Sequence, residues 1–274
     1  MRLGGYVLHR NNRETLGAAL SGLLAVCDEV VAVDSESTDG SVELARGMGA
    51  RGVTLPWQGY GAARAAAVRE LAGCDWVLFV DSDEQLSPEA VEVLRAWRSG
   101  AHGEVPAYLL PVRDWAELPG RRFHYRTGWR KRLVRREAAG WKPEMIVHET
   151  PGNLPTRKLH APIEHRFATS VARRSEKEER YALLWALKAQ VEGRRLKPAL
   201  LQRPAHVVRD CLVHGALWRG GMDALRLAWA VSGYHAAKYR YLRALRQGEH
   251  RELVAAFQEG RYGEVFDRVR EGRL

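Results

Sequence analysis

Two carboxylates stand two residues apart at the end of the most apolar strand-like segment of the chain. Asp81 and Asp83 directly follow residues 76–80, with only Ser82 between them. Because both side chains project from one turn, they can approach a single hard divalent cation, whose remaining positions are filled by water and phosphate oxygens. The spacing therefore predicts a site for Mn²⁺ or Mg²⁺, and the alternative is a solvated turn after a strand.

Polar residues follow other apolar segments in the same way. Arg10 and Asn11 come after the first such segment, and Asp34 ends the second. Asp34 can contact a nucleotide or can serve only to start the Ser-Thr-Asp-Gly turn that follows it. Arg64 stands in the first turns of an expected helix, where an arginine can meet a diphosphate with the help of the helix N-terminus; its alternative is an ordinary surface position.

Four repeats of a strand and a helix must position these side chains. Apolar runs predict the strands, and helical spacing or capping residues predict the helices between them. The expected strands are residues 3–8, 30–33, 53–55 and 76–80, and the expected helices are residues 14–26, 41–48, 60–71 and 87–98. Near-continuous apolar strands joined by helices are typical of a parallel sheet covered on both faces, in which ligands bind beyond the carboxyl ends of the strands. The polar clusters should therefore meet at one edge of an α/β domain.

The pattern changes after residue 110. Short strand-like pieces separated by loops come first, at residues 108–110, 133–134 and 145–147. Residues 119–142 are expected to be loop-dominated. Helices should follow at about residues 176–192, 199–218 and 222–246, with short helices to 270. We therefore expect a catalytic domain over residues 1–170 and a basic helical region over residues 171–274.

Several classes of protein are excluded or disfavoured. The sequence contains neither G-x-G-x-x-G nor G-x-x-x-x-G-K-[ST], which disfavours a dinucleotide dehydrogenase and a P-loop NTPase. Three cysteines without a C-x-x-C do not indicate a disulfide framework or a zinc site, and they favour a reducing cytoplasm. No window approaches about 18 uninterrupted apolar residues, so no transmembrane helix is expected.

Charge is divided unevenly along the 274 residues. Residues 1–110 carry 9 Lys and Arg against 15 Asp and Glu, whereas residues 111–274 carry 34 against 18, for a formal net charge of +10 overall. An acidic first part and a basic second part suggest two surfaces that face different partners.

The order of the motifs resembles the family 2 glycosyltransferases, which have the GT-A fold. The resemblance rests on V-V-A-V-D-S-E-S-T-D-G-S at 30–41, G-Y-G-A-A-R at 59–64 and W-V-L-F-V-D-S-D-E at 76–84. In the second half, R-K-R-L-V-R-R at 130–136, V-H-E at 147–149 and I-E-H at 163–165 are similar in order and spacing to a subgroup that includes bacterial lipopolysaccharide-core glucosyltransferases. The resemblance spans about residues 3–245.

This resemblance implies transfer of a sugar, usually from a UDP-sugar, with inversion at the anomeric carbon. Asp34 would contact the uracil or ribose, and Arg10, Asn11 and Arg64 would belong to the same nucleotide-sugar site. Asp81 would act on the nucleotide-sugar and its metal. Asp83 would be the more direct metal ligand. The sequence departs from the family where Asn12 replaces a frequent Glu and where Arg64-Ala65 replaces a frequent Lys-Asn.

Two residues of the second half complete the expected site. An inverting transfer needs one general base for the acceptor hydroxyl, and Glu149 is the candidate, with a surface position as its alternative. The resemblance also suggests His165 as a further metal ligand, and an imidazole would suit Mn²⁺ somewhat better than Mg²⁺; the alternative is a structural histidine at a strand end. A bound cation would stabilise the leaving diphosphate.

The basic second part allows three interpretations. The arginine- and tryptophan-rich stretch near residues 121–141 is compatible with phosphate contacts of a nucleic acid, although no nucleic-acid motif is present. The aromatic, aliphatic and basic mixture at residues 224–243 suits an anionic membrane surface. A core helix with a solvated arginine face explains the same composition.

These features together favour a metal-dependent hexosyltransferase. Its expected donor is a UDP-sugar, and its expected acceptor is a glycolipid, a lipid-linked molecule or a cell-envelope polysaccharide such as lipopolysaccharide core. We expect it in the cytoplasm or peripherally on the inner face of the cytoplasmic membrane. The alternative is a basic nucleic-acid-binding or nucleotidyl-transferring protein with the same α/β architecture, although nucleic acid is the less favoured partner.

Overall fold

The chain folds into two compact units. The computed structural model describes residues 1–100, 105–146, 150–196 and 202–272. Among these residues, the first unit consists of 1–114, 127–145 and 150–166, and the second consists of 115–126, 146 and 167–272. Each unit is therefore built from segments that are distant in the sequence.

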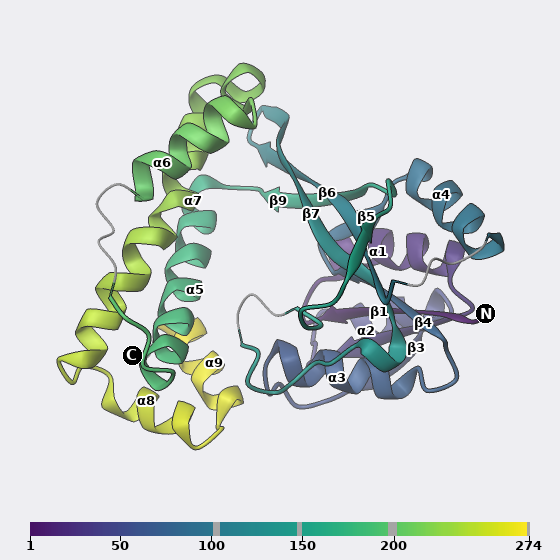
Figure 1. The fold of residues 1–274 in the computed structure, drawn as a ribbon, viewed down its shortest axis with the longest axis horizontal. Coiled ribbons are helices and arrows are strands. Elements are labelled where there is room, and N and C mark those ends of the chain that lie inside the picture. The colour runs from purple at the N-terminus through teal and green to yellow at the C-terminus, as the bar shows by residue number, and fades with distance from the viewer. Residues whose placement is uncertain (101–104, 147–149, 197–201, 273–274) are drawn as a thin grey trace. The chain divides into compact units, whose positions relative to one another are not determined.

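A mixed sheet of nine described strands belongs mainly to the first unit (Figure 1). Its strands are β1 (Leu3–His9), β2 (Glu29–Asp34), β3 (Arg51–Thr54), β4 (Trp76–Asp81), β5 (Glu84–Leu86), β6 (Ala107–Leu118), β7 (Arg121–Arg135), β8 (Thr156–Lys158) and β9 (Ile163–Ala168). Their order is β3-β2-β1-β4-β7-β6-β9-β5, with β8 paired to β6. The first four strands are parallel, as expected, whereas β7 is antiparallel to β4 and β5 is antiparallel to β9.

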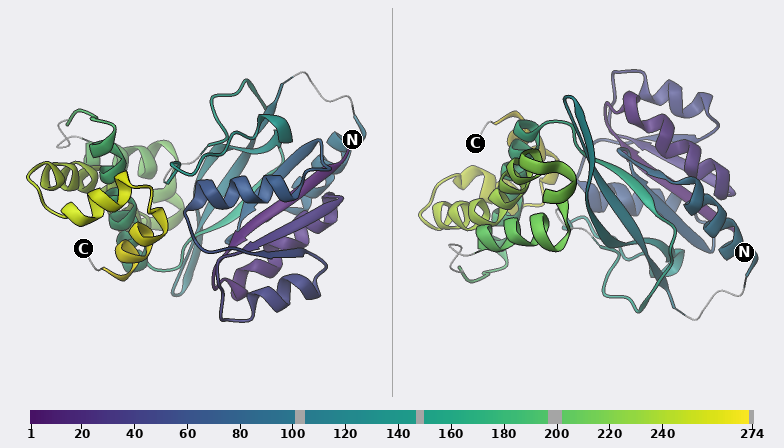
Figure 2. Two further views of the ribbon diagram at one scale, coloured as in Figure 1. Left: turned by 90° about the horizontal axis from the view of Figure 1, so that it is seen from below. Right: turned by 90° about the horizontal axis from the view of Figure 1, so that it is seen from above.

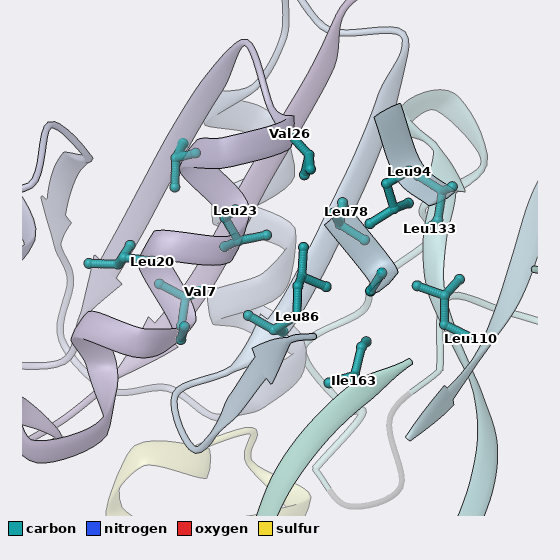
Figure 3. Packing of buried hydrophobic residues seen from close by; sticks show 14 of the residues in the cluster. Val7, Leu20, Leu23, Val26, Leu78, Leu86, Leu94, Leu110, Leu133 and Ile163 are labelled. Atoms are coloured by element: carbon teal, nitrogen blue, oxygen red, sulfur yellow. The ribbon is translucent and has the colours of Figure 1, made fainter. Parts of the chain in front are cut away.

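Helices cover both faces of the parallel half of the sheet, as the apolar strands predict (Figure 2). One face packs against α1 (Arg13–Val26), α2 (Ser41–Gly47) and α4 (Pro88–Ser99), and the other packs against α3 (Tyr60–Glu70). Figure 3 shows Leu23, Leu78 and Leu94 within the first of these two cores. Full burial of one such side chain stabilises the fold by roughly 1.5–3 kcal/mol, so this layer holds the strand ends in fixed positions.

The expected loop at residues 119–142 is wrong, because β7 occupies most of it. The turn before β7 contains Pro119 and Gly120, and Gly120 has φ +75°. Proline followed by a residue with positive φ is typical of a type II turn, which lets β6 and β7 pair as a hairpin. The strand expected at residues 145–147 is also not found: Met145 and Ile146 are not in a strand, and residue 147 lies outside the described residues.

The second unit is largely helical. Its helices are α5 (Val171–Val191), α6 (Gln202–Val208), a π-helical segment (Arg209–Val213), α7 (Ala216–Arg246), α8 (Arg251–Gln258) and α9 (Tyr262–Glu271). The backbone of α7 is interrupted at Gly221, where φ is 56° and ψ is −137°. Within the described part of the chain, we find no helix with the length and hydropathy needed to cross a membrane.

Much of the segment at residues 224–243 is core rather than surface. Ala224, Leu227, Val231, Tyr234 and Tyr239 are all buried. The interpretation of this stretch as a core helix with a solvated arginine face therefore describes most of it better than the interpretation as a membrane-facing helix.

Candidate functional site

The ends of three parallel strands meet at one edge of the sheet in the first unit. In the ladder, His9 on β1 pairs with Asp34 on β2, and Leu8 on β1 pairs with Asp81 on β4. One strand therefore separates Asp34 from Asp81, which corresponds to about 10 Å between the outer strands. The parallel register alone brings these two carboxylates to the same edge.

Asp81 is held between two buried arginines. Arg64 Nη2 donates to Asp81 Oδ1 at 2.7 Å, and Arg132 Nη2 donates to Asp81 Oδ2 at 2.9 Å. Burial alone would raise the pKa of Asp81, but the charges of Arg132 and Arg64 outweigh it and hold the pKa well below its usual range. Asp81 is therefore a permanent carboxylate, and both of its oxygens already take part in ion pairs.

Arg64 is part of an aromatic layer and is not on the surface. Its side chain is buried in α3, and its guanidinium carbon lies 5.1 Å from the centre of the Phe79 ring and 5.3 Å from that of Trp141. The alternative of a surface position is therefore wrong for Arg64. Its guanidinium group donates to Asp81. The sequence therefore predicted that Arg64 belongs to the site, but it did not predict Asp81 as its partner.

A buried carboxylate, Glu84, anchors the turn that carries Asp81 and Asp83. Arg132 Nη2 donates to Glu84 Oε1 at 2.5 Å, and Arg130 Nη1 lies 3.5 Å from the same oxygen. The other oxygen of Glu84 accepts a hydrogen bond from the backbone N–H of Asp81 at 3.0 Å. Glu84 thus fixes the backbone of the turn and the position of Arg132 together.

Asp83 and His165 are brought together by the pairing of β5 with β9, in which Glu84 is opposite His165. His165 Nε2 lies 3.6 Å from Asp83 Oδ2, and His165 Nδ1 lies 2.7 Å from Asp114 Oδ1. Burial alone would lower the pKa of His165, but its hydrogen bonds to Asp114 and Asp83 raise the pKa to about 9. The imidazole is therefore oriented by Asp114 and directed toward Asp83.

Asp34 and Asn11 form a separate group in the loops after β1 and β2. The buried Asp34 accepts hydrogen bonds from the backbone N–H of Ser37 at 3.1 and 3.2 Å, and His9 Nδ1 lies 3.5 Å from its Oδ1. Asn11 Oδ1 accepts from the backbone N–H of Thr38 at 2.8 Å. The turn-forming role of Asp34 is therefore real in this structure, and its contact with a nucleotide stays a prediction.

The loop that precedes the candidate base is fastened to the start of α3. Gly61 N donates to Met145 O at 3.1 Å, and a Cβ atom on Gly61 would lie 2.0 Å from Lys142 O. Only glycine permits this approach. Glu149 itself lies outside the described residues, so its role stays a prediction.

The residues present fit a divalent cation in part. Among the described residues, no group of three or more His, Cys, Asp or Glu side chains could hold a metal ion. Asp83 and His165 offer one carboxylate and one imidazole, a donor set that suits Mn²⁺ if donor oxygens and water complete the coordination. Asp81 is engaged by the two arginines, and its role as a metal ligand stays a prediction.

Asp114 was not among the expected site residues, and Arg130 and Arg132 were expected only as part of a family motif and of a stretch compatible with phosphate contacts. The signal was the alternation of β7, because residues two apart in a strand share one face. Arg130 and Arg132 both pair with Glu84, whereas Lys131 Nζ donates to Gly152 O elsewhere. The two arginines therefore form ion pairs with a carboxylate of the turn after β4.

Residues 7–158 match the family described as glycosyl transferase family 2. An uncharacterized glycosyltransferase of Rickettsia conorii is 38% identical over 88 residues, which cover 32% of this chain and 31% of that protein. The chain thus matches about a third of the length of that relative.

Two further likenesses extend over more of the chain. The lipopolysaccharide core biosynthesis glycosyltransferase LpsC of Rhizobium meliloti is 25% identical over 266 residues, covering 92% of this chain and 94% of that protein. Among solved structures, mannosyl-3-phosphoglycerate synthase from Rubrobacter xylanophilus has a TM-score of 0.47 and 16% identity, covering 72% of this chain and 76% of that one. The predicted GT-A class, a sheet flanked by helices and followed by a helical region, is confirmed.

Proposed function

The chain belongs to glycosyl transferase family 2, and on this premise we propose that it transfers a hexose from a UDP-sugar to a lipid-linked acceptor of the cell envelope, with inversion at the anomeric carbon. The observation that carries the proposal is the Asp83–His165 pair beside Asp81 at the carboxyl end of β4. In sheets of this type, ligands bind at that end of the strands. A carboxylate and an imidazole that can share a divalent cation support this proposal, because such a cation would bind the diphosphate of a nucleotide-sugar.

We assign the metal to Asp83 Oδ2 and His165 Nε2. Mn²⁺ bound there would supply charge neutralisation for the leaving diphosphate. Asp114 accepts from His165 Nδ1 and so presents Nε2 toward Asp83. A carboxylate behind a ligating histidine fixes the tautomer and the orientation of the ring, and it strengthens the ring as a ligand.

We assign the donor to the strand ends on both sides of β1. Asp34 and the loop of Arg10 and Asn11 would receive the nucleoside. Asp81 is ionised and its side chain is 37% exposed, so it can accept hydrogen bonds from hydroxyl groups of the donor. Because Arg64 is bound to Asp81, we propose that it positions this carboxylate and does not contact the diphosphate directly.

The acceptor hydroxyl must lose a proton as it attacks the anomeric carbon. We propose Glu149 as the base, since a carboxylate is a suitable proton acceptor and residue 149 follows in the sequence soon after Met145, which Gly61 contacts. The hydroxyl oxygen forms the new bond to the anomeric carbon, the bond to the diphosphate oxygen breaks, and Glu149 takes the proton.

The class of acceptor is supported by likeness over most of the chain. LpsC carries lipopolysaccharide core biosynthesis in its name, and it matches 92% of this chain. We therefore propose a lipopolysaccharide-core intermediate or a similar glycolipid as the acceptor. Such an acceptor is anchored in a membrane, where the enzyme would meet it as a peripheral protein.

One experiment tests donor, metal and site together. UDP release is measured from several UDP-sugars with Mn²⁺, Mg²⁺ or chelator, with and without an extracted glycolipid fraction. We expect glycolipid-dependent UDP release that needs a divalent cation and is lost in Asp83→Asn. Asp267→Asn is the matched control, because it makes the same change in an exposed ion pair of α9.

Two outcomes would contradict the proposal. Full activity of Asp83→Asn would remove this carboxylate from the site. Calorimetry that detects no UDP or UDP-sugar binding in the presence of Mn²⁺ would remove the donor class altogether.

A further inference from the structure

The second unit exposes large apolar side chains on successive segments, from the end of α6 through the π-helical segment into α7. We call this set the corner patch and define it by Val208, Leu212, Val213, Trp218, Met222 and Trp229, all of which are exposed. Val213 and Trp218 are 77% and 76% exposed and stand on either side of the turn at Gly215. Large apolar side chains left exposed on successive segments are typical of a surface that binds a partner.

The corner patch lies on a firmly packed base. Within this unit, Cys211, Ala216, Ala224 and Leu227 are buried in one apolar cluster on the inner side of the same segments. A Cβ atom on Gly220 would lie 2.5 Å from the Phe123 ring, so the start of α7 is pressed against the hairpin tip. The segments are therefore apolar on both sides, and the core explains only the inner one.

Arginines lie near the corner patch, whereas the carboxylates in the same described segment are buried or paired. Among the described residues 202–231 there are two carboxylates: Asp210 is buried, and Asp223 pairs with Arg226 at 3.2 Å. Arg203 lies 3.7 Å over the Trp229 ring and donates to a backbone carbonyl. Arg219 likewise donates to backbone carbonyls, and among the described residues neither guanidinium group forms an ion pair with a carboxylate.

Exposed apolar side chains together with arginines favour one class of partner over another. A second copy of the chain that met the corner patch through a two-fold axis would bring the arginines of one patch near those of the other, and the described part of the patch offers no exposed carboxylate apart from Asp223, which pairs with Arg226. An anionic lipid surface supplies the opposite charge for the arginines and an apolar layer for the side chains between them. Tryptophan is enriched at such interfaces because its ring has an apolar body and a polar N–H group.

We infer that the corner patch docks the protein on an anionic phospholipid membrane, with Val213 and Trp218 inserted below the headgroups. This inference rests on the proposed function only in that the acceptor is lipid-linked. Each basic residue near an anionic surface strengthens binding about fivefold, so binding should require anionic lipid and weaken with salt.

Flotation of the full chain with vesicles, without donor or acceptor, tests the inference. Vesicles of phosphatidylcholine with about 30% phosphatidylglycerol should carry the protein, and pure phosphatidylcholine vesicles should carry much less. The double variant Val213→Ser/Trp218→Ala should bind the anionic vesicles at least about tenfold more weakly, because it removes the two most exposed apolar groups. Val191→Ser is the matched control, since Val191 is exposed on α5 outside the patch, and it should bind as the wild type does.

The outcomes separate this inference from the proposed function. No binding to anionic vesicles, or an equal loss in Val191→Ser, would overturn it. A self-association seen by sedimentation and abolished by the double variant, without vesicle binding, would assign the patch to a second copy instead. UDP binding with Mn²⁺ is measured on the same preparations, and its failure would reject the proposed donor while leaving the vesicle result intact.

Discussion

Raising the pH should destabilise the metal-free protein through one buried histidine. Burial by itself lowers the pKa of His165, but its hydrogen bonds to Asp114 and Asp83 raise the pKa to about 9. In the unfolded chain the same imidazole has a pKa of about 6.5. Because the folded pKa is the higher one, the stabilisation is fully present below about pH 6.5 and is lost as the pH rises through about 9.

The size of the effect follows from the shift in pKa. Each pKa unit corresponds to about 1.4 kcal/mol, so the imidazolium of His165 contributes at most about 3 kcal/mol to the free energy of unfolding. The assay is urea unfolding with chelator at pH 6 and pH 9.5, for the wild type and for His165→Gln. The wild type should lose about 3 kcal/mol more than the variant between the two pH values, since all other titrating groups are shared.

A second readout uses the metal. Mn²⁺ needs the unprotonated imidazole, so its apparent affinity for the wild type should rise about tenfold per pH unit until about pH 9. If wild type and His165→Gln lose equal stability between pH 6 and pH 9.5, the imidazolium is not part of the folded state and the reasoning fails. An Mn²⁺ affinity that does not change with pH would remove His165 from the proposed ligand set.

Three further predictions concern other residues of the chain. Arg132→Met leaves the buried Glu84 without its nearest partner and should cost about 3–5 kcal/mol in urea unfolding, whereas the exposed Arg122→Met should cost less than about 0.5 kcal/mol; equal losses would contradict the buried pair. Gly61→Ala should lower the transfer rate while the fold is kept, because the new Cβ atom would collide with a backbone carbonyl in the loop before the proposed base; an unchanged rate would show that this loop is not needed. Glu149→Gln should retain calorimetric UDP binding and lose at least about 10²-fold in transfer, and near-normal turnover would exclude it as the base.

The parallel half of the sheet was predictable because its signals are local. The apolar run at residues 76–80 agrees with β4 to within one residue, and the predicted start of α1 lies one residue from its observed start. Strands buried on both faces give uninterrupted apolar runs, and parallel strands end together, so the edge that carries Asp34 and Asp81 follows from the sequence alone.

The antiparallel half was not predictable in the same way. β7 carries arginines at positions that face the site, so its charge indicated a loop, although Arg130 and Arg132 pair with acids from other strands. The partners are far apart in the sequence: His165 and Asp114 are 51 residues apart. Such pairs depend on which strands become neighbours, and no local pattern contains that information.

The two arginines that hold Asp81 make three positions depend on one another. Both guanidinium groups lie over the same Phe79 ring, at 5.1 and 5.2 Å, and both carry positive charge. Removing the carboxylate would leave two like charges buried side by side, which destabilises the fold before any effect on the donor is measured. Single substitutions of Asp81, Arg64 and Arg132 should therefore lower the yield of folded protein to a similar degree. Redesign of this strand end for another sugar has to change the neighbouring residues of α3 and β7 first.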